Sequence, residues 1–220
     1  MTKEKKISVM TIYIIIFYAI WTVFELIIKD FLDSVIVNVN LCQFVKSGII
    51  KNIVWTFPAI MLVKHYKNDV SISLKEMFDI RCNWIKYLPI FALFTIYLLV
   101  GALLLNGEIA IVDEFDIDKI IIVLFVGLTE EMVFRGWLLN ATIQEDKKWK
   151  GIIINAIMFV VIHFPIWIHD GIFISCFTEF TFLSVLVLSV IFSWTFIKSR
   201  NILIPITLHM YWDLLVFMFY

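Results

Sequence analysis

The amino-acid sequence predicts an all-α, polytopic membrane bundle with about seven transmembrane helices. Hydrophobic residues make up 62% of the 220 residues and charged residues 17%, whereas about 25% of an average soluble domain is charged. The mean hydropathy is +0.95. The apolar residues are gathered into runs that approach the roughly 20 residues a helix needs to cross a bilayer. We therefore expect an integral membrane protein without a separate soluble domain.

Seven apolar runs form the expected helices, and all are long enough, or nearly so, to span the membrane. They cover residues 7–28, 41–63, 84–105, 120–139, 151–167, 172–197 and 202–220. The first run is longer than a signal-peptide core and no small-residue cleavage pattern follows it, so we expect a retained signal anchor. The second contains Lys46 and Lys51, which could snorkel outward or mean that the embedded helix begins later. Residues 70–80 are expected to form a short amphipathic surface helix.

The distribution of lysine and arginine predicts a cytoplasmic N-terminus. With that orientation the outer loops contain little more than Lys29 and Lys119, whereas twelve cations lie in the inner segments, which is the positive-inside pattern. The inner cations are Lys3, Lys5, Lys6, Lys64, Lys67, Lys75, Arg81, Lys147, Lys148, Lys150, Lys198 and Arg200. Frequent Ile, Lys and Asn are typical of an AT-rich bacterial genome, so we expect a multi-pass protein of a bacterial plasma membrane, in contact with its lipid bilayer.

Composition excludes two classes of partner or site. The net charge is −1, and no basic face is large enough to bind a nucleic-acid phosphate backbone. No nucleic-acid partner is therefore expected. The three cysteines are odd in number and widely spaced, which indicates neither a disulfide framework nor a cysteine metal site. The oligomeric state has no signal in the sequence.

Ionisable residues inside three of the apolar runs mark the candidate site. Glu130, Glu131 and Arg135 lie in the fourth run, His163 in the fifth and His209 in the seventh. A charge at the bilayer centre costs at least a few kcal/mol, so such residues are functional by default and face the protein interior. Glu131 and Arg135 have the i, i+4 spacing of an ion pair. Glu130 points about a quarter-turn away on the helix and stays available for chemistry.

The depths of these residues predict one shared cavity. Counted at ~1.5 Å per residue from the inner ends of their runs, Glu130, His163 and His209 lie roughly 12–18 Å deep. Asp213 lies one turn beyond His209 on the same helical face. We expect the polar atoms of the first three residues to converge to within roughly 6 Å. The cavity is expected to open towards residues 64–81 and 147–150, because the depths are measured from that side.

Carboxylates and imidazoles in such a cavity point to hydrolysis. Glu130 and His163 could activate a water directly, or they could bind one divalent metal such as zinc together with His209. His209 could also donate to the oxyanion, with its ring held by Asp213. The residues alone leave the metal-dependent and metal-free schemes open.

Three short motifs follow one another in the last hundred residues. They are Glu130-Glu131 with Arg135-Gly136, Phe159 with His163, and His209 with Asp213. Together they resemble the EExxxR motif, continuing as FRG, and the second and third motifs of the CAAX prenyl protease and bacteriocin-processing (CPBP, or Abi) family of intramembrane proteases.

The resemblance implies a role for each motif residue. Glu130 and His163 would activate water, Glu131 and Arg135 would support the motif, and His209 with Asp213 would stabilise the oxyanion. An ionised Asp at position 213 only accepts hydrogen bonds, so it would orient His209 rather than face the oxyanion itself.

The resemblance also implies a function, a substrate class and a division of the chain. The function is an intramembrane endopeptidase of glutamate or metallo type, acting on a membrane or exported peptide or protein. Residues 120–220 would be the catalytic core and residues 1–119 three further membrane helices with a surface loop. The alternative is a non-catalytic scaffold or bacteriocin self-immunity protein, which would have no reason to keep all of Glu130, His163 and His209. Proton-coupled transport fits less well, because the chain lacks paired repeats.

Overall fold

The computed structural model describes residues 3–143 and 147–220, and these residues form helices and connecting loops without a β-strand. The predicted all-α membrane bundle is thereby confirmed. In the described residues, four helices are long and apolar enough to cross a membrane: Glu4–Val35, Trp84–Asn106, Lys148–His169 and Thr181–Ser199. Leu203–Phe219 is a shorter apolar helix. The protein is therefore embedded in a membrane.

The N-terminal half contains a long helical hairpin and a separate helix. The hairpin elements are α1 (Lys3–Val23), η1 (Phe24–Ile28), α2 (Lys29–Val35), α3 (Val39–Gln43), η2 (Phe44–Ile50), η3 (Asn52–Thr56) and α4 (Phe57–His65). The elements η1, η2 and η3 are π-helical. The short helix α5 (Leu74–Asp79) begins with a capping box between Ser73 and Glu76. A 3₁₀ turn, η4 (Trp84–Tyr87), leads into α6 (Leu88–Asn106).

The C-terminal half departs from the predicted runs at three places. Its elements are α7 (Ile117–Glu131), η5 (Met132–Leu139), α8 (Asn140–Thr142), α9 (Lys148–Val161), α10 (Phe164–His169), α11 (Phe173–Thr178), α12 (Thr181–Ser199) and α13 (Leu203–Phe219). The fourth run changes to a π-helix at Met132. The fifth breaks before α10, where Pro165 starts a new helix. The sixth is divided at Phe180, whose φ is 62°.

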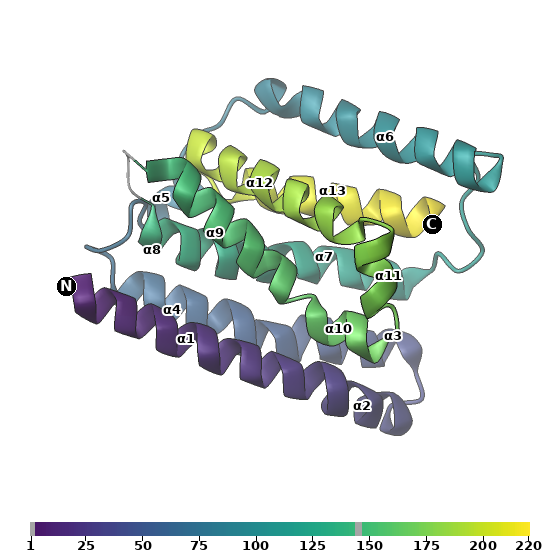
Figure 1. Ribbon diagram of the computed structural model, residues 1–220, viewed down its shortest axis with the longest axis horizontal. Coiled ribbons are helices and arrows are strands. Elements are labelled where there is room, and N and C mark those ends of the chain that lie inside the picture. The colour runs from purple at the N-terminus through teal and green to yellow at the C-terminus, as the bar shows by residue number, and fades with distance from the viewer. Residues whose placement is uncertain (1–2, 144–146) are drawn as a thin grey trace.

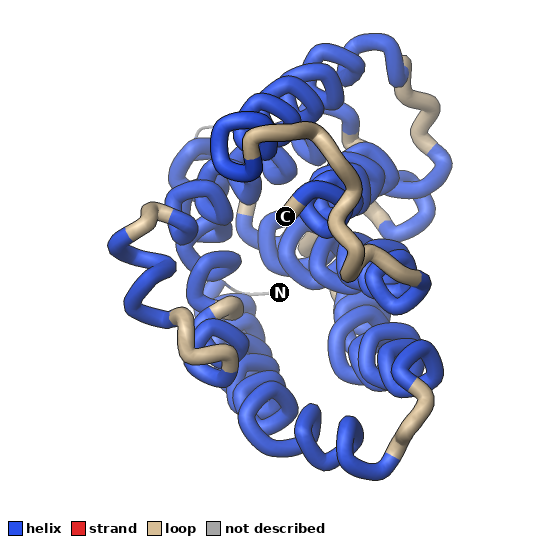
Figure 2. The backbone as a smooth tube through the Cα atoms, turned by 90° about the vertical axis from the view of Figure 1, so that its right-hand side faces the viewer, coloured by secondary structure: helices blue, strands red, loops and turns tan. Residues whose placement is uncertain are grey.

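The long helices lie side by side, with α7, α9, α12 and α13 in the middle, α1 and α4 on one side and α6 on the other (Figure 1). Figure 2 looks along the helices from the right-hand end of Figure 1 and shows the helices joined by loops. At Gly127 a Cβ atom would lie 2.7 Å from Met210 Cγ and 3.2 Å from the Ile206 carbonyl oxygen. Glycine at this position lets α7 approach α13 closely, as small residues do in membrane bundles.

One end of the bundle, where the N-terminus and α5 lie in Figure 1, is closed by polar and apolar contacts. Asn140 accepts a hydrogen bond from the Ile72 amide at 2.9 Å and donates to the Ile72 carbonyl at 2.7 Å. The Ile202 amide donates to the Met77 carbonyl at 2.8 Å. Behind these contacts Trp137 and Leu139 are buried in the main core. The loop before α5 is therefore held against the end of η5.

We predict that Asn140→Ala lowers the thermal stability of the protein. The substitution leaves the buried Ile72 amide and carbonyl without these partners, at about 1–3 kcal/mol for each group. Thermal unfolding in detergent measures the effect. Asn106→Ala is the control, because the exposed Asn106 side chain makes one hydrogen bond, to the Phe219 carbonyl at 3.1 Å. An unfolding temperature equal to that of the control would contradict the role of Asn140.

Candidate active site

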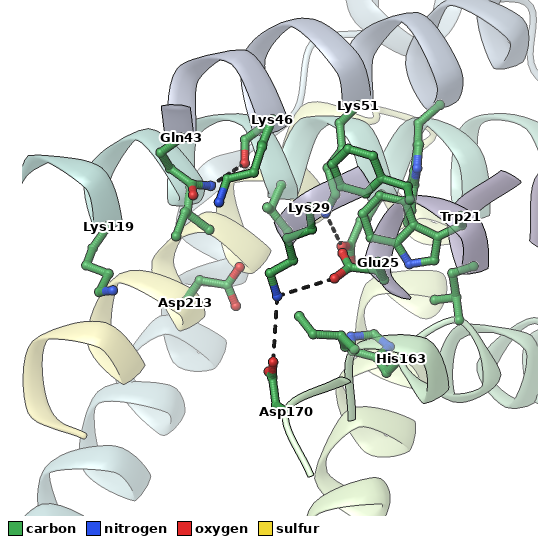
Figure 3. A pocket seen from close by; sticks show the side chains of 18 of the residues that line it. Trp21, Glu25, Lys29, Gln43, Lys46, Lys51, Lys119, His163, Asp170 and Asp213 are labelled. Carbon is green, nitrogen blue, oxygen red and sulfur yellow. Dashed lines mark hydrogen bonds and ion pairs between the residues drawn. The ribbon is translucent and has the colours of Figure 1, made fainter. Parts of the chain in front are cut away.

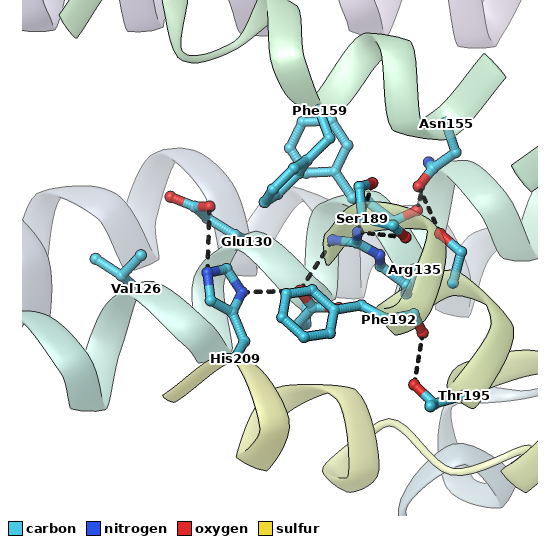
Figure 4. A network of polar contacts seen from close by, with 12 residues as sticks. Val126, Glu130, Arg135, Asn155, Phe159, Ser189, Phe192, Thr195 and His209 are labelled. Carbon is cyan, nitrogen blue, oxygen red and sulfur yellow. Dashed lines mark hydrogen bonds and ion pairs between the residues drawn. The ribbon is translucent and has the colours of Figure 1, made fainter. Parts of the chain in front are cut away.

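A buried ion pair stands at the centre of the candidate site. Arg135 and Glu131 are both 0% exposed, and the Arg135 Nη1 atom donates to Glu131 Oε1 at 2.9 Å. The pair is the one that the i, i+4 spacing predicts. Arg135 Nη2 also donates to the Ser189 hydroxyl at 2.7 Å and to the Ser189 carbonyl at 3.1 Å (Figure 4). Its guanidinium carbon lies 4.5 Å from the centre of the Phe159 ring, so the charge has both hydrogen bonds and a cation–π contact.

The ion pair lies where α7 changes into the π-helix η5, whereas the sequence predicts one uninterrupted α-helix. All eight residues from Met132 to Leu139 are buried. The Asn140 amide donates to the carbonyl of Arg135, five residues earlier, which is the π-helical spacing. π-Helical turns inside α-helices are frequent at functional sites. The motif therefore occupies the most buried and least regular part of its helix.

Glu131, and not Asp213, holds the ring of His209. His209 Nδ1 lies 2.9 Å from Glu131 Oε1, and because a carboxylate only accepts, Nδ1 is the donor. The opposite nitrogen, Nε2, lies 3.5 Å from Asp213 Oδ2 and 3.9 Å from Glu130 Oε2. The expectation that Asp213 lies beside His209 is met, but Asp213 faces the nitrogen that points towards Glu130.

His163 stands at the break between α9 and α10. Its Nδ1 atom lies 2.7 Å from the Phe159 carbonyl oxygen. Because a carbonyl only accepts, Nδ1 carries the proton of the neutral ring and Nε2 is left as an acceptor. The second motif, Phe159 with His163, thus fixes the tautomer through its own backbone.

Glu130 is 6% exposed and its two oxygens have different surroundings. Oε1 accepts a hydrogen bond from Lys51 Nζ at 3.2 Å. Oε2 is buried and has no hydrogen-bond partner among the described residues. Lys51 is buried and points inward, so the first of the two alternatives for this lysine, that it snorkels outward, is wrong. The signal was present, because the cost of an intramembrane charge that singles out Glu130 applies equally to a lysine inside an apolar run.

A cavity of about 490 Å³ connects these groups, and its lining includes Glu130, His163, Asp213 and Lys51 (Figure 3). His209 is not among its lining residues. Its Nε2 atom lies 3.9 Å from Glu130 Oε2. The cavity is also lined by Lys29, Lys119 and Asp170, which belong to the end of the bundle where α2 and α10 lie in Figure 1.

The prediction that the cavity opens towards residues 64–81 and 147–150 is wrong. The core residues of η5 and the contacts of Asn140 with the loop before α5 close that end. Equal depths along the helices placed the three residues on one level, but they did not determine which end is filled by side chains.

The donor atoms do not fit a metal ion. Among the described residues, no group of three or more His, Cys, Asp or Glu side chains is arranged to hold one. Glu130, His163 and His209, the ligands expected if a metal is used, therefore do not form such a group, and the Lys51 ammonium already binds Glu130 Oε1. The hydrolysis proposed for this site uses no metal.

Ser189 is a second residue that sequence reasoning missed, because a serine on an apolar helix resembles an ordinary packing residue. We predict that Ser189→Ala lowers stability by about 1.5–3 kcal/mol, the usual contribution of a hydrogen bond to a charged group. Thermal unfolding in detergent measures it. Ser184→Ala, on the same helix and at a half-buried position, is the control, and equal unfolding temperatures for the two variants would show that Arg135 does not depend on Ser189.

We also predict that Glu131→Gln destabilises the protein strongly. It removes the negative charge that faces Arg135 and His209 Nδ1, and the uncompensated charge of the buried arginine costs roughly 3–5 kcal/mol. The measurements are the yield of folded protein and the unfolding temperature in detergent. Glu179→Gln, at an exposed position, should leave both unchanged. A Glu131→Gln protein as stable as this control would rule out the ion pair as a structural centre.

The comparisons with known proteins bear on the same part of the chain. A family model described as Type II CAAX prenyl endopeptidase Rce1-like matches residues 117–215, a range that contains all three motifs. Neither the curated proteins nor the solved structures gave a match. The resemblance to the CAAX protease and bacteriocin-processing family is confirmed by this match. Residues 117–215, somewhat less than half of the chain, are therefore similar to the Rce1-like family of membrane endopeptidases.

Proposed function

We propose that the protein hydrolyses peptide bonds within the membrane, with Glu130 as the base that activates water. The observation behind this proposal is the free, buried Oε2 atom of Glu130, which lies 3.9 Å from His209 Nε2 in a site whose cavity is also lined by His163. Buried polar atoms without a partner are rare, and catalysis is one of the reasons for which they are kept.

Glu130 and His163 each offer one acceptor to the attacking water. Glu130 Oε2 and His163 Nε2 can accept its two protons in hydrogen bonds, which leaves an oxygen lone pair to attack the carbonyl carbon. Glu130 takes one proton as the carbon–oxygen bond forms. It then passes this proton to the leaving nitrogen as the carbon–nitrogen bond breaks, so the carboxylate is restored at the end of the reaction.

His209 is assigned to the oxyanion. With Nδ1 donating to Glu131, the protonated ring has a second N–H, on Nε2, which can donate to the developing negative charge. Glu131 holds the ring, and Asp213 Oδ2, 3.5 Å from Nε2, can accept that N–H before the oxyanion forms. This agrees with an acceptor-only role for an ionised Asp213.

Residues 120–220 are proposed as the catalytic core, and the substrate as a membrane or exported peptide or protein. In the topology proposed from the lysine and arginine distribution, the N-terminus is cytoplasmic and the chain crosses a bacterial plasma membrane several times. The cavity, which is lined by Lys29 and Lys119, would then open on the outer side. Exported substrates reach that side, which is why we prefer them.

We predict that Glu130→Gln abolishes cleavage while the fold is kept, because glutamine has the same size but cannot take a proton. The loss should be about 10²–10⁴-fold, the range for general base catalysis. The assay is turnover of quenched fluorescent apolar peptides by the full chain in detergent micelles.

Glu25→Gln is the matched control. Glu25 is a buried acid of the same cavity and pairs with Lys29 at 3.4 Å, outside the motifs. It should retain wild-type turnover. Near-normal turnover by Glu130→Gln would refute the mechanism, and a folded wild-type chain that cleaves no membrane peptide would favour a scaffold or self-immunity protein.

A further inference from the structure

Lys51 is the one residue outside the matched range 117–215 that bonds to a motif side chain in the part of the chain that the structure describes. It stands at the junction of η2 and η3, which pack against α7, and it is 9% exposed. Its Nζ atom lies 4.7 Å from the centre of the Trp21 ring and 4.9 Å from that of the Trp55 ring. Two aromatic faces thus stabilise the buried ammonium group and fix where it points.

The other lysines of the same cavity have different partners. Lys29 pairs with Glu25 and Asp170, Lys46 with Asp33 at 2.8 Å, and Lys119 with Asp118 at 3.2 Å. None of these carboxylates belongs to a motif. A buried lysine is costly unless it is paired, so the pairing of Lys51 with Glu130, 79 residues away in sequence, is a specific arrangement.

The hydrogen bond also distinguishes the two oxygens of Glu130. Lys51 occupies Oε1, and the free atom Oε2 is thereby turned towards His209 Nε2. Without a donor at Oε1, the carboxylate could rotate about its last side-chain torsion, which is broad and roughly two-fold. The position of the oxygen that faces the attacking water would then no longer be fixed.

We propose that Lys51 is a positioning residue of the hydrolytic site, holding Glu130 through Oε1 so that Oε2 meets the water. The proposal rests on the proposed function of Glu130. The catalytic site is then completed by the N-terminal hairpin, and residues 117–215 alone lack one of its parts. Because Lys51 acts through Glu130 and not through the substrate, its loss lowers kcat and leaves KM nearly unchanged.

The test compares three variants of the full chain in detergent micelles, with the peptide assay described above. Lys51→Met should lower kcat about 100-fold, the effect of displacing a catalytic group by about 1 Å, with KM close to that of the wild type. Lys51→Arg keeps a cation that can stack on tryptophan and should recover part of the lost kcat. Lys75→Met removes an exposed lysine of α5 that lies outside the cavity, and it should retain wild-type turnover.

A folded Lys51→Met protein with the kcat of Lys75→Met would overturn the proposal. So would a loss that appears in KM and not in kcat. If Lys51→Met does not fold, Lys51→Arg decides: a folded Lys51→Arg protein no more active than Glu130→Gln would contradict a positioning role, since its cation should still hold Oε1.

A second measurement separates this proposal from the proposed function. The pairing predicts that Lys51→Met lowers the unfolding temperature and that the double variant Lys51→Met, Glu130→Gln recovers part of it, because no unpaired charge is left buried. If the wild type cleaves no peptide but this recovery occurs, the hydrolase function fails while the pairing stands. If Glu130→Gln is inactive but Lys51→Met is fully active, only the role of Lys51 fails.

Discussion

The carboxylate of Glu131 is the interaction on which the rest of the site depends. One of its oxygens accepts from Arg135 Nη1 and from His209 Nδ1, both at 2.9 Å, and Arg135 continues to Ser189 on α12. Three helices are therefore fixed to one another by a group with no contact with water. An arginine cannot lose its charge in a protein, so Arg135 needs the carboxylate of Glu131 as its partner when the helices pack. Glu130, the residue that precedes Glu131, is positioned by this arrangement.

Close packing and catalysis are linked through α7. Gly127 allows α7 and α13 to approach closely, which brings His209 within reach of both motif glutamates. Five residues later the helix enters its π-helical segment. The helix is therefore irregular at the point where Glu130, Glu131 and Arg135 must face different neighbours. The aromatic rings of Phe159 and Phe192 fill the remaining space around the arginine.

Local physics explains what the sequence could predict. Intramembrane charge is costly whatever the fold, so Glu130, Arg135 and His209 could be selected as interior residues, and helical spacing alone pairs Glu131 with Arg135. The partner of His209 Nδ1 could not be predicted, because it depends on whether α7 turns Glu130 or Glu131 towards α13. The direction of Lys51 and the open end of the cavity depend in the same way on packing between helices distant in sequence. Motif spacing contains no information about either.

The cavity wall is shared between the two halves of the chain, and this has an evolutionary consequence. Gln43, Lys46 and Lys29 line the cavity, yet they lie outside the range that the family model matches. Substitutions at such positions change which side chains a substrate meets without altering the three motifs. Selectivity and chemistry can then diverge at different rates within one protein. Two chains with the same motifs can in this way acquire different targets, and the hairpin formed by α1 to α4 is where such differences would accumulate.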